Sequence, residues 1–116
     1  MIANNIVEKL EREKKGHEET VALRDSLVRL YNNKDFKNVI EHHFMEKACA
    51  RYARMSGLST LNTDARADAL SKAQAAGHLQ EWMHSIEMMA RQAEMSLQKI
   101  QDEEAEIRAE ALRGEE

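Results

Sequence analysis

Residues 79–111, with the sequence LQEWMHSIEMMARQAEMSLQKIQDEEAEIRAEA, decide the fold. Apolar residues recur there at alternating steps of four and three, and Glu104 alone interrupts the row. This spacing is the heptad pattern of a helix that packs along another helix. An apolar row of this length needs a partner, which is either the rest of the chain or a second copy. The row consists of Leu79, Met83, Ile86, Ala90, Ala93, Leu97, Ile100, Glu104, Ile107 and Ala111.

Composition supports long helices with a thin core. The chain has 116 residues, no proline, four glycines, and charged residues at 33%. Such a length fits a single domain spanning residues 1–116. Apolar residues at 42% can fill a narrow helical seam, but large side chains are few. Small domains bury a modest share of their surface, so self-association is a plausible source of stability.

Turn and capping signals divide the chain into three predicted helices. The first covers residues 2–32 and ends at the turn Asn32-Asn33-Lys34-Asp35, whose residues bond to their own backbone. The second covers residues 36–56, with Asp35 as its N-cap and Gly57 as its C-cap. The third covers residues 64–113 and is predicted to bend near Gly77. Short connections favour antiparallel neighbours.

These features predict an all-α fold of three to four helices. Its main element is a long antiparallel helical hairpin, similar to a coiled coil, with a short helix packed at one end. Four of the five aromatic residues lie between positions 31 and 52, so we expect the core there, at Phe36, Ile40, Phe44 and Tyr52.

The last helix carries the predicted interface. Methionine adapts to irregular partners and is enriched at binding surfaces, and four methionines lie between residues 83 and 95. Met88, Met89 and Trp82 cannot all face one seam, so some of them must point outward, where exposed apolar surface marks a contact. We therefore predict a homo-oligomer whose interface includes Met83, Ile86, Met89, Leu97, Ile100 and Ile107.

Charge and hydropathy limit the classes of partner that the sequence favours. The net charge is −4, and residues 101–116 hold seven acidic residues against two arginines. The remaining chain is only weakly basic, which does not favour nucleic acid as a partner. No apolar run reaches the length of a transmembrane helix, and the first residues lack a signal-peptide pattern. We expect no membrane association.

Catalytic and metal sites find little support. His42, Glu46 and Cys49 fall on one side of the second helix, and a zinc site can be drawn from them, but no further ligand completes a tetrahedral set. Cys49 is the only cysteine, so no intramolecular disulfide forms. No nucleophile is paired with an oxyanion hole, and no glycine-rich loop can hold a phosphate. The sequence predicts no enzyme, no metal and no cofactor.

Several segments resemble a family of small all-helical proteins of unknown activity encoded among the structural genes of tailed bacteriophages. The resemblance rests on Asn33-Lys34-Asp35-Phe36-Lys37-Asn38-Val39-Ile40, on Phe44-Met45-Glu46, on Ala50-Arg51 and on Ala75-Ala76-Gly77-His78-Leu79, followed by the Ala/Glu-rich helix. It covers roughly residues 30–113. The chain departs from the family in having Lys34 where proline is common and a histidine pair in the second helix.

The resemblance implies a structural or assembly role and no reaction. We expect a non-enzymatic virion or capsid-assembly protein, located in the virion or the host cytoplasm, with other virion proteins as partners. One alternative is a small phage regulator that binds a host protein through its acidic C-terminal helix. Another is a metal-dependent helical protein.

Overall fold

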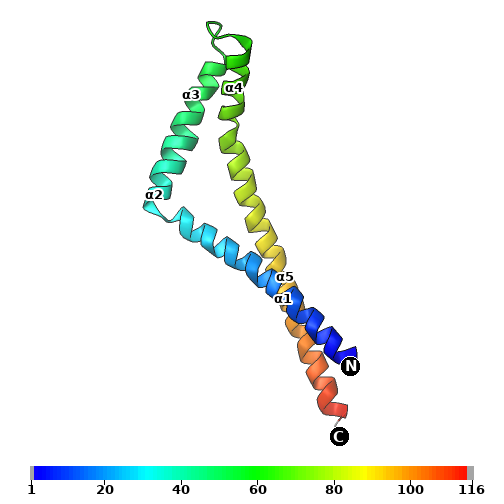
Figure 1. Ribbon diagram of the computed structural model, residues 1–116. Helices are drawn as coiled ribbons and strands as arrows, with labels where there is room; N and C mark the ends of the chain where they lie inside the picture. The colour runs from blue at the N-terminus through cyan, green and yellow to red at the C-terminus, as the bar shows by residue number, and fades with distance from the viewer. Residues whose placement is uncertain (1, 115–116) are drawn as a thin grey trace. The chain divides into compact units, whose positions relative to one another are not determined.

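The structure is a computed structural model that describes residues 2–114, and this part of the chain is helical without any β-strand. Breaks at residues 32–33, 57–62 and 74 divide it into four helical runs, as Figure 1 shows. The all-α class and the antiparallel hairpin architecture predicted from the sequence are confirmed. The elements are α1 (Ile2–Tyr31), α2 (Lys34–Phe36), the π-helix η1 (Lys37–Ala48), α3 (Cys49–Ser56), α4 (Thr63–Ala73) and α5 (Ala75–Gly114).

Contacts group the chain, which the sequence suggested as one domain, into two compact units. One unit joins the N-terminal part of α1, up to Asp25, to the part of α5 that begins at Ile86. The other comprises Ser26–Ser85. Each unit has its own antiparallel helix pair, and we describe each by itself.

In the first unit, α1 and α5 run in opposite directions. Val7 and Ile107 line the same cavity, whereas Arg24 pairs with Glu94, so higher residue numbers on α1 meet lower numbers on α5. Helix α1 continues without a break through Gly16. A Cβ atom at Gly16 would meet nothing within 4 Å, so no close packing requires glycine there.

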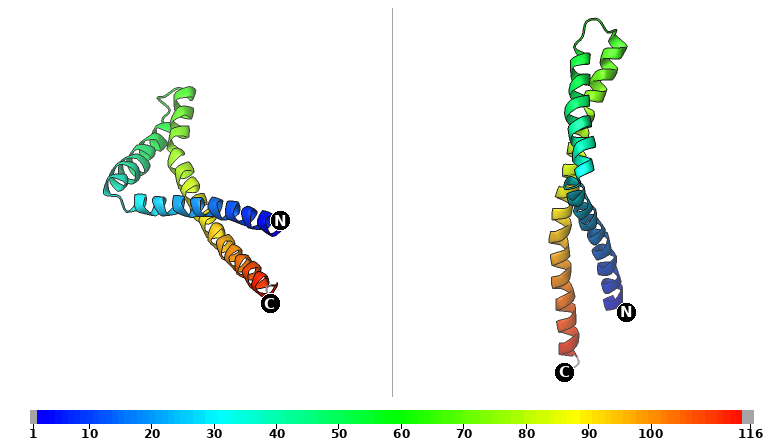
Figure 2. Two further views of the ribbon diagram at one scale, coloured as in Figure 1. Left: turned by 60° about the horizontal axis from the view of Figure 1, so that its bottom comes forward. Right: turned by 90° about the vertical axis from the view of Figure 1, so that its left-hand side faces the viewer.

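The second unit contains the hairpin of α3 and α4, which pack against each other (Figure 2). Its helix starts are capped by asparagine side chains. Asn33 Oδ1 accepts a hydrogen bond from Phe36 N at 3.0 Å, and Asn62 Oδ1 accepts one from Ala65 N at 2.8 Å. The cap of α2 therefore lies two residues before Asp35, the residue that the sequence suggested. Gly57 ends α3 with φ −98°, without the left-handed conformation that glycine permits.

The N-terminal half of the predicted helix 36–56 has wider turns than an α-helix. From Lys37 to Ala48 the backbone is π-helical, and Cys49 N donates to Phe44 O, five residues back. The half-buried residues from position 36 to position 48 are Phe36, Ile40, Glu41, Phe44, Met45 and Ala48. Val39, which α-helical spacing would place on the same face, is 56% exposed.

The predicted bend near Gly77 lies three residues earlier. Helix α4 ends at Ala73, and Gln74 interrupts the run before α5 begins. Gly77 lies inside α5, where a Cβ atom would meet no neighbour within 4 Å. The two helices remain linked by backbone hydrogen bonds, since Gln74 N donates to Leu70 O and His78 N donates to Gln74 O, each at 3.1 Å.

The buried core is thin and consists mostly of small or medium side chains. In the second unit Leu27, Cys49, Ala69 and Met83 are buried, and in the first Leu10 on α1 faces a buried row on α5. The four residues predicted as the core, Phe36, Ile40, Phe44 and Tyr52, are all only half-buried. The buried row on α5 is Ile86, Ala90, Ala93 and Ile100.

Candidate functional site

Helix α5 carries the residues predicted as an interface, and the structure separates them by exposure. Met83, Ile86 and Ile100 are buried. Leu97 and Ile107 are half-buried, and Met89 is exposed. The heptad row therefore lies mostly within the chain's own packing.

A second apolar surface lies outside that row. In the first unit Met88, Met89 and Met95 are 50%, 52% and 67% exposed. In the heptad pattern of α5, Met88 and Met95 are one repeat apart and lie on the side opposite the buried row. Met89 lies at the position next to the buried row. We call these three residues the methionine face. Flexible thioether side chains on an exposed helix face suit packing against another helix.

The α1 side of the first unit is mixed in polarity. Facing α5, Leu10 is buried and Val21 is half-buried, and three polar residues, Lys14, His17 and Arg24, are half-buried as well. Arg24 Nη1 donates to Glu94 Oε1, and this hydrogen bond raises the pKa of the Arg24 guanidinium above its usual value. Both side chains of the pair remain partly exposed, so the pair is a surface ion pair.

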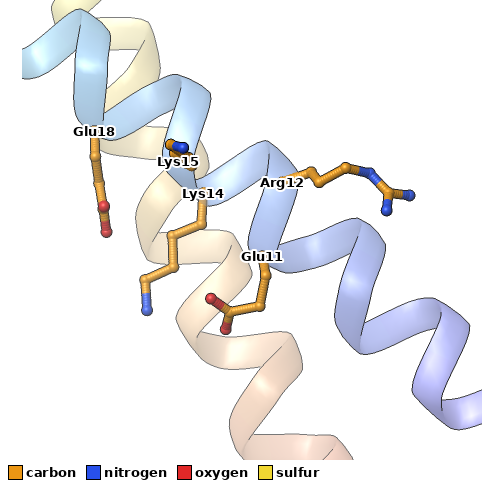
Figure 3. A pocket seen from close by; sticks show the side chains of 5 residues that line it. All are labelled: Glu11, Arg12, Lys14, Lys15 and Glu18. Carbon is orange, nitrogen blue, oxygen red and sulfur yellow. The ribbon is translucent and has the colours of Figure 1, made fainter.

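Charged side chains also line a shallow groove along α1. Glu11, Arg12, Lys14, Lys15 and Glu18 form it, at the three- and four-residue spacings of helical charge pairs. Figure 3 shows Glu11, Lys14 and Glu18 extending to one side of the helix and Arg12 to the other. Three positive side chains, Arg12, Lys14 and Lys15, lie between two negative ones, Glu11 and Glu18, so most of the charge of the groove is neutralised within it.

An open cavity lies between α1 and α5. It measures about 170 Å³ and is lined by Val7 and Glu11 of α1 and by Glu104, Ile107 and Arg108 of α5. Glu104 is the residue that interrupts the apolar row, and its Oε1 atom is buried without a hydrogen-bond partner in the described part of the chain. An unsatisfied buried oxygen of this kind costs free energy and calls for an explanation.

The structure does not assemble the metal site drawn from the sequence. His42 Nδ1 lies 3.2 Å from Glu46 Oε2, and both side chains are exposed. Cys49, by contrast, is buried, and its thiol donates to Lys72 O at 3.7 Å. Within residues 2–114, no group of three or more His, Cys, Asp or Glu side chains is placed to hold a metal ion.

A cation–aromatic cluster fastens α3 to α4 and has no counterpart in the sequence expectations. Arg51 Cζ and Lys72 Nζ each lie 5.6 Å from the centre of the Tyr52 ring. Lys72 Nζ also donates to Asp68 Oδ2 at 2.8 Å, and this hydrogen bond raises the pKa of Lys72. A cation over an aromatic face is stabilised by the ring's quadrupole, so the cluster stabilises the packing of α3 against α4.

Comparison with known proteins finds no relative of this chain. No family model, no curated protein and no solved structure matches this chain. Among the described residues, none of the helices combines the length and the apolar character needed to cross a bilayer.

Proposed function

We propose that this protein is a non-enzymatic assembly protein that works as a helical oligomer. The observation that carries the proposal is the methionine face, because three large apolar side chains stand at least half exposed beside a thin core. Exposed apolar side chains that share a helix face favour contact with a partner. A second copy of the chain presents the same face, so a symmetric contact is available.

The setting that we propose is a bacteriophage particle. Support comes from the resemblance carried by residues 33–40, 44–46, 50–51 and 75–79 to small helical proteins encoded among phage structural genes. In this role the chain contacts other virion proteins, either in the virion or during assembly in the host cytoplasm. No residue is assigned a catalytic role.

The test of oligomerisation is light scattering coupled to size-exclusion chromatography, on the full chain at micromolar concentrations. We expect the wild type to elute above the monomer mass and the variant Met88→Glu/Met95→Glu to shift toward the monomer mass. The matched control is Gln92→Glu, which adds an exposed charge to the same helix without removing an apolar side chain. A wild-type chain that remains monomeric would contradict the proposal.

Mass spectrometry of purified bacteriophage particles and of their precursors tests whether the protein belongs to the particle. A fixed copy number in mature particles identifies a structural component. Presence only in precursors identifies a scaffold or an assembly chaperone. Absence from both would refute the virion role.

A second candidate is a phage regulator that binds a host protein through the acidic end of α5. It is favoured by the exposure of Asp102, Glu103, Glu106 and Glu110 at that end. Neutralising these four residues to Asn or Gln preserves the helix and removes four negative charges. Loss of host-protein binding with an intact oligomer would favour the regulator, whereas loss of the oligomer would assign the segment to assembly.

A further inference from the structure

The two helices of the first unit are poorly matched in polarity. On α5 the covered row is apolar, at Ile86, Ala90, Ala93 and Ile100. On α1 the row that faces it holds the buried Leu10 and the half-buried Val21, with the half-buried Lys14, His17 and Arg24 between and beyond them. Burying long charged side chains against an apolar row gives little hydrophobic gain and costs side-chain entropy.

Glu104 makes the match worse. Its partnerless oxygen borders the same cavity as Glu11 of the facing helix, which carries a like charge, and Arg108, which lies on α5 itself. The pairing of α1 with α5 therefore leaves a buried acceptor unsatisfied. Of the apolar residues of α1 nearby, Val7 lines the cavity but is 39% exposed, and Ile6 is 45% exposed.

The ion pair that joins α1 to α5 near Asp25 is weak. Arg24 and Glu94 pair across the two helices, but the pair is partly exposed, and Arg24 also contacts Asp25 of its own helix at 3.2 Å. Exposed ion pairs of this kind contribute little to stability and are screened by salt. Helix α1 up to Asp25 thus covers an apolar row that it matches only in part, through Leu10 and Val21, and the ion pair adds little to the contact.

We propose that residues 2–25 of α1 are a displaceable cover, and that α5 of a second copy replaces them in an antiparallel orientation. This inference rests on the proposed oligomeric function and names the second surface through which copies meet. Displacement of the cover exposes the row from Ile86 to Ile107, whose heptad spacing suits another helix with the same spacing.

Size complementarity favours the antiparallel orientation. When Ile86 of one α5 lies level with Glu104 of the other, each alanine faces a large residue, because Ala90 meets Ile100 and Ala93 meets Leu97. Alternating small and large side chains across a seam fill it without voids. A parallel pair in register would instead set alanine against alanine and leave a gap in the seam.

Charge complementarity favours the same orientation. A parallel pair sets Glu104 against its own copy and brings both acidic ends, residues 101–116, together. Like charges at one seam position are unfavourable, and their repulsion is strongest where solvent is excluded. The antiparallel pair moves the two acidic ends to opposite ends of the seam.

The proposed displacement of residues 2–25 is tested by changing the polarity of the α1 side chains that face α5. Lys14→Leu/His17→Leu makes the facing row of α1 apolar, so it should strengthen the cover and raise the dimer dissociation constant at least tenfold. Leu10→Asp removes the apolar anchor and should lower that constant. Lys15→Leu is the matched control, because Lys15 is exposed on the same helix and should leave the constant unchanged. Sedimentation equilibrium of the full chain measures all four proteins.

The orientation is tested by a distance between spin labels. Leu112 is exposed near the end of α5, and Cys49 is the only cysteine, so Cys49→Ala/Leu112→Cys carries one label per chain. An antiparallel seam centred near residue 95 places the two labels about 50 Å apart, at 1.5 Å per helical residue. A distance below about 20 Å would indicate a parallel pair and overturn the inference.

The outcomes separate this inference from the proposed function. A chain that stays monomeric in every variant contradicts both. Dimers that ignore the α1 substitutions but vanish in Met88→Glu/Met95→Glu preserve the proposed function and overturn the cover. Dimers that weaken with Lys14→Leu/His17→Leu and show the long label distance support the cover and its replacement by a second α5.

Discussion

Replacement of Glu104 by leucine should stabilise the protein. The substitution removes a buried oxygen without a hydrogen-bond partner, and relief of such a group is worth about 1–3 kcal/mol. Leucine also continues the apolar row and can fill part of the 170 Å³ cavity beside Val7 and Ile107. Leucine and glutamate have similar helix propensities, so the backbone contributes little.

The assay is urea unfolding followed by circular dichroism at 222 nm. Protein concentration must be fixed, because association alters apparent stability. We expect Glu104→Leu to raise the free energy of unfolding by about 1–3 kcal/mol. The control is Glu103→Leu, an exposed neighbour on α5 that should change stability by less than about 0.5 kcal/mol. A Glu104→Leu variant no more stable than this control would refute the reasoning about the seam.

Four further substitutions test separate parts of the fold by the same unfolding assay. Gly16→Ala should stabilise α1 by up to about 1 kcal/mol, since a Cβ there meets nothing, and a loss of stability would show hidden crowding. Asn62→Ala removes the N-cap of α4 and should cost about 1 kcal/mol, with no change if water replaces the cap. Ile100→Ala truncates a buried side chain and should cost about 2–4 kcal/mol, and a cost below 1 would place it outside the core. Lys72→Gln should lower the urea midpoint slightly at pH 7, and the difference from the wild type should shrink as pH rises above 10.5. This follows because Asp68 raises the pKa of Lys72 above its usual 10.5, so the stabilising contribution is present below that pH and is lost as pH rises through the folded value. A midpoint difference that does not shrink as pH rises above 10.5 would exclude the charge as its source.

Periodicity predicted the helices and the buried row of α5 well. The heptad steps from Met83 to Ile100 identified side chains that the structure buries, except for Leu97, which is half-buried, because one helix face must be excluded from water whatever covers it. The interruption at Glu104 was also visible in the sequence. Its partnerless oxygen was not, because that depends on which side chains of α1 lie opposite.

Other features depend on geometry that residue spacing does not encode. The core expected at Phe36, Ile40, Phe44 and Tyr52 is half-buried, since a thin pair of helices cannot enclose large side chains on all sides. The π-helical turn of η1 changes which residues share a face, and α-helical spacing therefore misplaced Val39. The pairing of α1 with α5 follows from the predicted antiparallel hairpin, but the residue spacing did not indicate that Lys14, His17 and Arg24 would be half-buried in that pairing.

Sedimentation equilibrium of the full wild-type chain, from about 1 to 100 µM, tests the central claim most directly. The account predicts a mass that rises with concentration from the monomer value of 13.3 kDa to at least twice that value. The same series on Met88→Glu/Met95→Glu should remain closer to the monomer throughout. A wild-type mass of 13.3 kDa across the whole range would contradict assembly through helical association.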